Sequence, residues 1–440
     1  MAKLLLILVA LTAGLASTFQ LLRYPARLRT TFETGVDYFS GFSRSGETFL
    51  NATDNEGGLT FRIWDLHSGK ALISLGFKPT EIDNLAISPD GKFLALWDYD
   101  NGLKLWDVTE STKQIAIKNK AEPRFGRPEL KFSPDSRLLA VTFTAPNNLF
   151  HICLLDTKTG IEVARFNEAP GALAFAPDGQ LLAWATWDSH CEHVFLRLWS
   201  RETKHTQSHL VGQHFPISQL SFSPDGRVAT GSYVEGERGK TEVRLWDAAT
   251  LEEIARFIPC KEWSSIYAIT FSPSGRLLMV DGDGKSVVWD VALTPPQRLA
   301  EFANTPVFTR DGAEMMVVCG EEKDVIELWD SKSLQRRATC RCRGALSLGS
   351  SWSAYASSIS PDGKWVAFQC QDDAPHSSLV DWFSKRIGLR DEDGESMRLW
   401  DIKTNSELAS FTGYQHLSFS PKGDTFAICS PSGGVKIWEL

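Results

Sequence analysis

Four consecutive residues of this chain have side chains that bind transition metals. They are His190, Cys191, Glu192 and His193, and imidazole, thiolate and carboxylate are the groups that hold zinc or copper in proteins. Adjacent residues in a loop rarely converge on one ion, because their side chains point in different directions. We therefore interpret the stretch as an exposed polar hairpin, and we expect no metal site there.

A second possible metal pair is formed by Cys340 and Cys342. One Cys-x-Cys pair lacks the other ligands that a zinc site needs. The surrounding residues 337–343 alternate small and basic side chains, and charges on an exposed edge strand prevent its pairing with other sheets. The pattern therefore predicts an outer edge strand.

The segment 281–286, with the sequence DGDGKS, ends like a phosphate-binding loop. Met279 stands where that loop requires its first glycine, five positions before Gly284. The segment also runs into an apolar strand at 287–289, whereas phosphate loops open a helix. An Asp-Gly pair such as Asp283-Gly284 is typical of a β-hairpin turn, so we expect a hairpin.

Motifs of catalytic sites are otherwise missing from the sequence. The chain contains no G-x-S-x-G, no H-E-x-x-H and no C-x-x-C, which are the patterns of common nucleophilic, zinc-dependent and redox centres. We expect a protein without cofactor or metal that is not an enzyme.

These candidate residues are positioned by a repeated unit, which is clearest at residues 220–257. A short apolar strand leads into the turn Ser223-Pro224-Asp225-Gly226, in which proline and glycine supply the required backbone angles. A second strand follows, then an alternating third strand that ends in Trp246-Asp247, and finally a fourth. Such a short sheet needs covered faces, so copies of the unit must pack against one another.

Two marks count these units independently, the turn after the first strand and the end of the third strand. The first strand ends at Phe42, Ile87, Phe132, Phe175, Phe222, Phe271, Phe308, Ile359 and Phe419, and the third strand at Asp65, Asp107, Asp156, Ser200, Asp247, Asp290, Asp330, Asp401 and Glu439. Both marks occur nine times and alternate strictly along the chain. The period is about 46 residues, close to the ~40–45 of a four-stranded propeller blade.

This pattern resembles the WD-repeat β-propeller family. The resemblance implies an all-β fold, a single closed propeller over residues 26–440 with nine four-stranded blades. Because common propellers have ~4–8 blades, eight is the alternative. The last unit has three strands of its own, and residues 26–33 resemble a fourth, so we expect this strand to close the ring. The Gly-His pair of typical repeats is mostly absent from the sequence.

The overall charge limits the range of partners. The formal net charge is −8 and the pI is near 5.7, whereas nucleic-acid binding needs a basic surface. We expect a protein or peptide partner and no nucleic acid.

The N-terminal residues 1–25 form a separate segment. Residues 4–22 carry no charge, and Arg23, Arg27 and Arg29 follow. Nineteen such residues in a helix nearly span a ~30 Å hydrocarbon core, which predicts a membrane anchor. The alternative is a signal peptide cleaved near Ala16, followed by export.

The longest insertion, residues 371–396, lies in the eighth unit. Its residues Leu379, Phe383 and Ile387 share one face of a predicted helix, and Val380 and Trp382 flank them. The helix is either a lid on the propeller or a docking site for a partner. We expect an interaction scaffold that is membrane-tethered or exported. The alternative is an enzyme or small-molecule sensor that uses the propeller channel.

Overall fold

The fold was analysed in a computed structural model of the chain. It describes residues 27–32, 36–43, 45–54, 59–77, 82–98, 102–109, 113–117, 129–144, 150–168, 171–187, 193–213, 217–234, 240–261, 263, 265–319, 325–341, 357–371, 395–404, 406–412, 416–429 and 435–440. All regular elements in these ranges are β-strands. The ranges contain no helix with the length and apolarity that a membrane crossing requires.

The strands form blades of four, and each blade is numbered by its order in the chain. Blade 1 contains β2 (Val36–Phe42), β3 (Thr48–Asp54), β4 (Leu59–Asp65) and β5 (Ala71–Phe77), and blade 2 contains β6 (Ile82–Ile87), β7 (Phe93–Asp98), β8 (Gly102–Asp107) and β9 (Lys113–Ile115). Blade 3 contains β10 (Leu130–Phe132), β11 (Leu138–Thr144), β12 (Phe150–Asp156) and β13 (Glu162–Phe166), and blade 4 contains β14 (Leu173–Phe175), β15 (Leu181–Trp187), β16 (His193–Ser200) and β17 (Thr206–Gln213). Blade 5 contains β18 (Gln219–Phe222), β19 (Arg227–Tyr233), β20 (Thr241–Asp247) and β21 (Glu253–Phe257).

The second half continues in the same order. Blade 6 contains β22 (Ala268–Phe271), β23 (Leu277–Gly282), β24 (Lys285–Asp290) and β25 (Gln297–Phe302), and blade 7 contains β26 (Val307–Phe308), β27 (Glu314–Cys319), β28 (Val325–Asp330) and β29 (Arg336–Arg341). Blade 8 contains β30 (Ser357–Ile359), β31 (Trp365–Gln371), β32 (Glu395–Asp401) and β33 (Ser406–Thr412). Blade 9 contains β34 (His416–Phe419), β35 (Thr425–Cys429), β36 (Val435–Glu439) and β1 (Arg27–Phe32).

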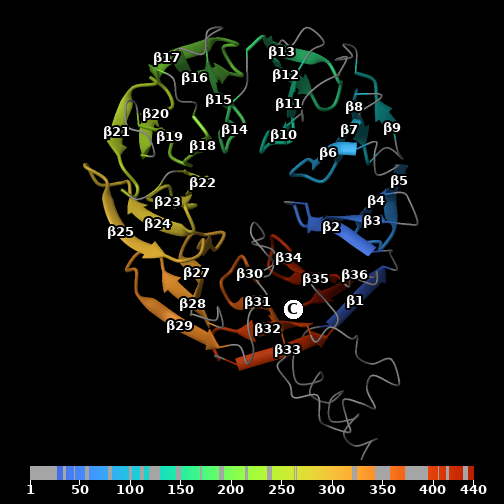
Figure 1. Cartoon of the computed structure of the whole chain (residues 1–440). Helices are drawn as coiled ribbons and strands as arrows, with labels where there is room; N and C mark the ends of the chain where they lie inside the picture. The colour runs from blue at the N-terminus through green and yellow to red at the C-terminus, as the bar shows by residue number, and fades with distance from the viewer. Residues whose placement is uncertain are drawn as a thin grey trace, which may run out of the picture.

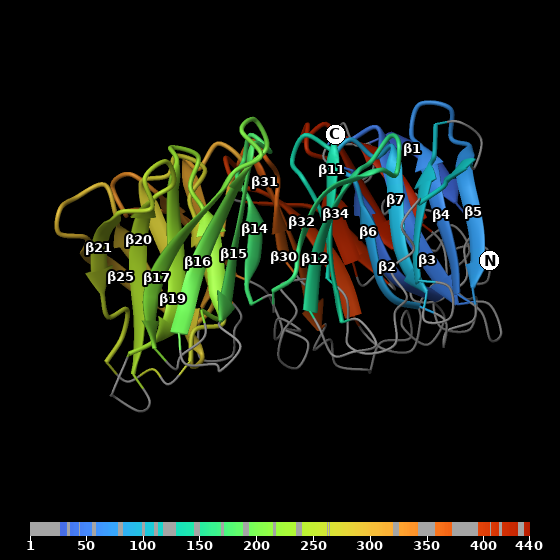
Figure 2. The same cartoon turned by 90° about the horizontal axis from the view of Figure 1, so that it is seen from above.

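The blades surround a central axis as one ring (Figure 1). In blades 1 to 8 the four strands pair in chain order, antiparallel throughout, and the first strand is the innermost. Figure 2 shows the sheets side by side and edge-on. The described strands form nine such sheets, so the count of nine from the repeats is confirmed and the alternative of eight is wrong.

Blade 9 is completed by the two ends of the described chain. β1 pairs antiparallel with β36, from Arg27 opposite Glu439 to Phe32 opposite Val435. The outer position that β5, β9 and their equivalents occupy elsewhere is thus filled by the strand with the lowest residue numbers. This is the pairing expected from the sequence of residues 27–32.

The hydrophobic core is divided among the junctions between blades. Each junction has its own cluster of buried side chains, contributed by the facing sheets of two neighbours. Phe49 of blade 1, for example, packs with Ala427, Val435 and Ile437 of blade 9, so the ring is closed by packing as well as by strand pairing. Equivalent clusters join blades 1 and 2, 2 and 3, 3 and 4, 4 and 5, 5 and 6, 6 and 7, 7 and 8, and 8 and 9.

The outer strands are bent by a recurring β-bulge. The register between third and fourth strand shifts at Ile63/Trp64, Leu154/Leu155, Leu245/Trp246, Val288/Trp289, Leu328/Trp329 and Leu399/Trp400. A bulge twists an edge strand and makes it a poorer template for further pairing. The repeat therefore protects its own outer edges at the position of its tryptophan.

Two expected elements lie outside the described residues. The N-terminal hydrophobic helix falls in residues 1–25, and the helix of the insertion falls in residues 372–394. Both stay predictions.

Candidate functional site

The turn between first and second strand is built around a serine. In blade 2, Ser88 Oγ donates to Asp90 Oδ1 at 2.6 Å and accepts from the backbone N–H of Phe93 at 2.9 Å. Gly91 takes the left-handed conformation, with φ of 73°. Ser133, Ser223 and Ser360 make the same hydroxyl-to-aspartate bond in their blades. The Ser-Pro-Asp-Gly turn is thus stabilised by a hydrogen bond between its own serine and aspartate side chains.

The turn between third and fourth strand depends on the aspartate that follows the tryptophan. Asp247 Oδ1 accepts from the backbone N–H groups of Ala249 and Thr250 at 2.8 and 2.9 Å. These bonds hold the pKa of Asp247 below its ordinary value, with the Thr250 N–H as the largest cause. Since both kinds of turn join strands at the same end of an antiparallel sheet, they lie on one face of the ring, here called the turn face.

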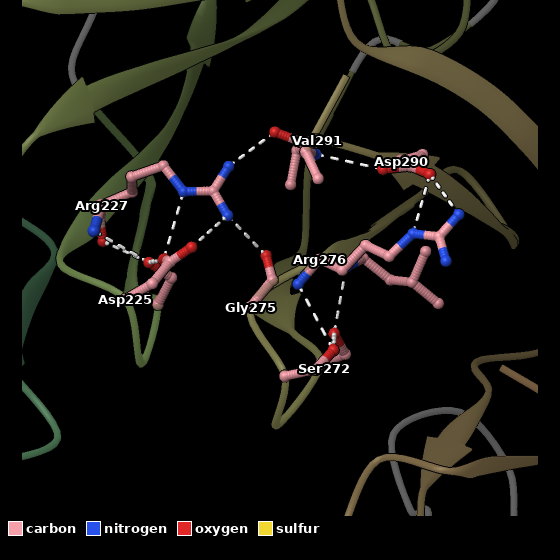
Figure 3. A network of polar contacts seen from close by, with 11 residues as sticks. Asp225, Arg227, Ser272, Gly275, Arg276, Asp290 and Val291 are labelled. Atoms are coloured by element: carbon pink, nitrogen blue, oxygen red, sulfur yellow. Dashed lines mark hydrogen bonds and ion pairs between the residues drawn. The ribbon is translucent and has the colours of Figure 1, made fainter. Parts of the chain in front are cut away.

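Neighbouring blades touch one another through these turns. A side chain at Gly179 would meet the carboxylate of Asp135 in the preceding blade at 2.9 Å, and one at Gly275 would meet Asp225 at 3.1 Å. Between blades 5 and 6 an arginine adds to this contact (Figure 3). Arg227 donates to the carbonyl oxygens of Val291 and Gly275 at 2.6 and 2.7 Å. At these junctions the turns of neighbouring blades are therefore in direct contact along the turn face.

The carboxylate of Asp225 orients that arginine. Asp225 accepts from Arg227 Nη2 at 2.7 Å and also from Ser223 Oγ. Burial alone would raise the pKa of Asp225, but the hydrogen bonds from Arg227 and Ser223 outweigh it and lower the pKa. The pair stabilises the contact between blades 5 and 6, because the other N–H groups of the guanidinium donate to carbonyl oxygens of blade 6.

A groove lies on the outer rim of the ring, between blades 7 and 8. It has a volume of about 370 Å³ and is lined by Arg336, Arg337, Ala338, Thr339, Ile402 and Lys403. The first four residues belong to β29, the last strand of its sheet, so its outer edge pairs with no described strand. The other two form the turn after β32, where the backbone N–H of Lys403 donates to Asp401. The groove therefore has a strand edge on one side and a rigid turn on the other.

Basic side chains line the groove, and its two arginines are ion-paired, Arg337 with Asp330 at 3.4 Å as well as with Glu314. Three of its six lining residues are basic and none is acidic. Arg336 pairs with Glu327, and Arg337 with Glu314 at 2.7 Å, yet the two arginine side chains remain 55% and 58% exposed. Arg337 is also the extra residue of the β29 bulge, and a bulge redirects the side chain that it adds. Carboxylates behind the strand thus orient the arginines, whose outer sides face solvent.

The segment 281–286 forms a hairpin of blade 6, as expected from its sequence. β23 and β24 pair from Gly282 opposite Lys285, with Asp283 and Gly284 as the turn. Asp281 is 8% exposed and accepts from Ser286 Oγ. Burial raises the pKa of Asp281 despite hydrogen bonds from Ser286 and Thr305. No feature of this hairpin provides the helix N-terminus of a phosphate site.

The other candidates from the sequence are only partly described. His193 begins β16, whereas residues 190–192 lie outside the described ranges, and in those ranges no group of three His, Cys, Asp or Glu residues could hold a metal ion. Cys340 lies in β29, an outer strand as expected, and Cys342 is outside. The proposed docking residues Leu379, Val380, Trp382, Phe383 and Ile387 also fall outside.

The groove was not predicted from the sequence. The sequence pattern indicates the basic strand, but its charge is interpreted there only as protection of the edge. The second wall, Ile402 and Lys403, is more than 60 residues away in the chain. The available signal was the pair of adjacent arginines in a fourth strand. In the outer strands β13, β21 and β25 the charged residue at that point is followed by an apolar one.

Comparison with known proteins agrees with the repeat pattern. The family model of the WD domain, G-beta repeat (WD40) matches residues 255–290, from the outer strand of blade 5 to the third strand of blade 6. Pre-mRNA-processing factor 19 of Oryza sativa subsp. japonica is 22% identical over 230 residues, 51% of this chain and 41% of that protein. The WD repeat-containing protein SL1-17 of Schistosoma mansoni is 30% identical over 127 residues, 29% of this chain and 40% of that protein.

A solved structure shares the fold. The crystal structure described as that of the eukaryotic initiation factor superposes with a TM-score of 0.56 at 14% identity, covering 85% of this chain and 87% of that one. The chain spans about two fifths or less of the length of the first curated relatives that it matches.

The nine sheets, their serine turns and their tryptophan–aspartate strand ends define a β-propeller built from WD repeats. With the WD-domain match at residues 255–290, the chain is similar to the WD-repeat β-propeller family in fold and repeat pattern. Propellers of this family generally act as scaffolds for protein interaction and generally lack enzymatic activity.

Proposed function

We propose that this chain is a non-enzymatic interaction scaffold whose rim groove between blades 7 and 8 binds an acidic, extended segment of a partner protein. The observation that carries the proposal is the combination of an unpaired strand edge with three basic side chains, Arg336, Arg337 and Lys403. An extended peptide can add to the edge of a sheet through main-chain hydrogen bonds. Carboxylates on that peptide would meet the exposed guanidinium groups.

The charge of the whole molecule supports a local site of this kind. The net charge is −8, so an acidic partner is repelled by most of the surface and attracted only where basic groups gather. Complementary charge of this sort adds specificity and association rate more than raw affinity. An acidic partner would therefore bind at the groove and not elsewhere on the surface.

The experiment uses a displayed library of random 12-residue peptides and the immobilised full chain. Peptides selected on the native protein should be rich in Asp and Glu. They should lose binding to the variant Arg336→Glu/Arg337→Glu/Lys403→Glu and keep it on a control variant, Lys92→Glu/Lys158→Glu/Lys204→Glu, which reverses the same number of exposed charges on the turn face. Loss of binding to both variants, or selection without acidic enrichment, contradicts the proposal.

The proposal includes attachment to a membrane. Residues 4–22 are uncharged and long enough to serve as an anchor; the alternative is export after cleavage near Ala16. Full-length protein should then remain with membranes after carbonate extraction. A mature N-terminus near Ser17 would instead support the signal peptide.

A further inference from the structure

The chain contains one N-x-[ST] pattern, Asn51-Ala52-Thr53. In proteins that meet an oligosaccharyltransferase, this pattern directs a glycan to the asparagine, and the modified asparagine then lies in a surface loop. The location of Asn51 in the fold therefore tests whether this protein is compatible with that enzyme.

Asn51 lies in the core of blade 1. It belongs to β3, the second strand of its sheet, where its backbone is opposite Ser40 on one side and Arg62 on the other. The residue is 0% exposed, and its side-chain oxygen accepts from Trp64 Nε1 at 2.8 Å. Asn51 thus provides the acceptor for the indole N–H of Trp64, the partly buried repeat tryptophan of blade 1.

The folded blade 1 has no room for a glycan on Asn51, because this side chain is fully buried. Transfer joins Asn51 Nδ2 to the first carbon of the sugar, while the lipid pyrophosphate carrier leaves and the amide nitrogen loses a proton. The product would place a bulky, hydrated oligosaccharide where the folded blade leaves no solvent access. The transferase acts on chains that are still extended, so burial in the final fold would not protect Asn51.

From this conflict we infer that the propeller folds on a side of the membrane where no oligosaccharyltransferase acts. If residues 4–22 anchor the protein, the ring lies on the face opposite the glycosylating lumen. The charges that flank the apolar segment do not settle this orientation, since Lys3 precedes it and Arg23 follows it. The inference is independent of the partner groove.

The test places a reporter site on the exposed surface. Lys204→Asn creates an N-x-T pattern with His205 and Thr206, and position 204 is exposed with φ of 58°, a conformation that asparagine tolerates. The full chain carrying Lys204→Asn is translated with endoplasmic-reticulum microsomes. No endoglycosidase-sensitive product should appear. A glycosylated product that is also as resistant to trypsin as the unmodified chain would overturn the inference.

A forced-import arm tests the structural reason separately. A strong cleavable signal sequence replaces residues 1–25 and delivers the ring to the lumen. The native sequence should then acquire a glycan at Asn51 and become readily cleaved by trypsin, whereas Thr53→Val, which removes the acceptor pattern at nearly constant side-chain volume, should restore resistance. Equal resistance of the glycosylated and Thr53→Val proteins would show that blade 1 accommodates the glycan, and the inference would fail.

Discussion

Phe257, at the end of the outer strand of blade 5, packs against Trp289 of blade 6 with 4.3 Å between the ring centroids. The same two repeat positions meet at other junctions, in the pairs Phe166 and Trp199, Phe302 and Trp329, and Phe411 and Trp438. Two marks that are separate along each repeat are therefore partners across blades at these four junctions.

Replacing this phenylalanine should weaken the junction. Phe257 is half-buried, so Phe257→Ala should lower the free energy of unfolding by about 1.5–3 kcal/mol through lost apolar burial and ring contact. The matched control is Phe150→Ala, since Phe150 is 43% exposed and should change stability by less than about 0.5 kcal/mol. Urea unfolding measures both. Similar losses for the two variants would contradict a special role for the interblade pair.

The arginine contact across the turn face gives a second prediction. Arg227→Ala removes two hydrogen bonds to carbonyl groups of blade 6, and bonds from a charged donor contribute about 1.5–3 kcal/mol each at most. Arg137 occupies the same repeat position in blade 3, but it is 71% exposed and lies 3.9 Å from Asp135. We expect Arg227→Ala to lower the thermal midpoint clearly and Arg137→Ala to leave it nearly unchanged. A larger effect at Arg137 would refute this assignment.

Asp281 should make stability depend on pH in an unusual direction. Its pKa in the folded protein is raised by burial above the ordinary value of 3.8, so its stabilising contribution is fully present below about pH 3.8 and is lost as pH rises through the folded-state pKa. Asp281→Asn keeps an acceptor for Ser286 without the buried charge. The variant should therefore be more stable than the native protein at pH 7, and this advantage should shrink as the pH approaches 4.

Asp225→Asn is the control of opposite sign. The pKa of Asp225 is lowered because its hydrogen bonds outweigh burial, so its contribution is present above the unfolded-state pKa and is lost as pH falls through the folded-state value. This variant should be less stable than the native protein at pH 7, with the deficit shrinking in acid. Chemical unfolding at pH 7, 4 and 3 distinguishes the cases, because the contribution of Asp225 is lost only below about pH 3.8. The same sign for both variants at pH 7 would disprove the argument.

Ring closure can be tested with two truncations. A chain that begins at Leu21 keeps β1, whereas one that begins at Gly35 lacks it and leaves the outer edge of β36 unpaired. The longer chain should unfold cooperatively, and the shorter one should melt at a lower temperature or aggregate, because an open strand edge pairs with other chains. Indistinguishable melting of the two would show that β1 contributes nothing to closure.

Much of the fold could be predicted because each repeat has local marks. Ser-Pro-Asp-Gly specifies a turn through bonds within a few residues, as at Ser223 and Asp225. The turn that the repeat predicts after Phe132 has serine in place of glycine, and Ser136 adopts the left-handed conformation with φ of 61°. Because the Gly-His pair is mostly absent, the sequence does not identify acceptors for the indole N–H groups of the repeat tryptophans. In the structure Trp246 donates to Thr230 and Trp64 to Asn51.

The groove could not be predicted for a physical reason. Its walls, Arg336 and Lys403, come from different blades, and contact between them depends on the angle at which two sheets pack. Local propensity and strand alternation describe one blade at a time. The hydrogen bond from Arg227 to the carbonyl oxygen of Val291 could not be predicted either, because the two residues belong to different blades and meet only when those blades pack.

The pairing of β1 with β36 has a consequence for synthesis. β1 precedes its partner β36 by about 400 positions in the chain, so it is made long before that partner. At ~5–20 residues per second, β1 waits roughly 20–80 s for a strand to pair with. Throughout that interval blades 2 to 8 can each assemble on the preceding blade, while the ring stays open as an arc. The ring therefore closes only after β36 has been made, and a chain that stops before β36 leaves both ends of the arc exposed.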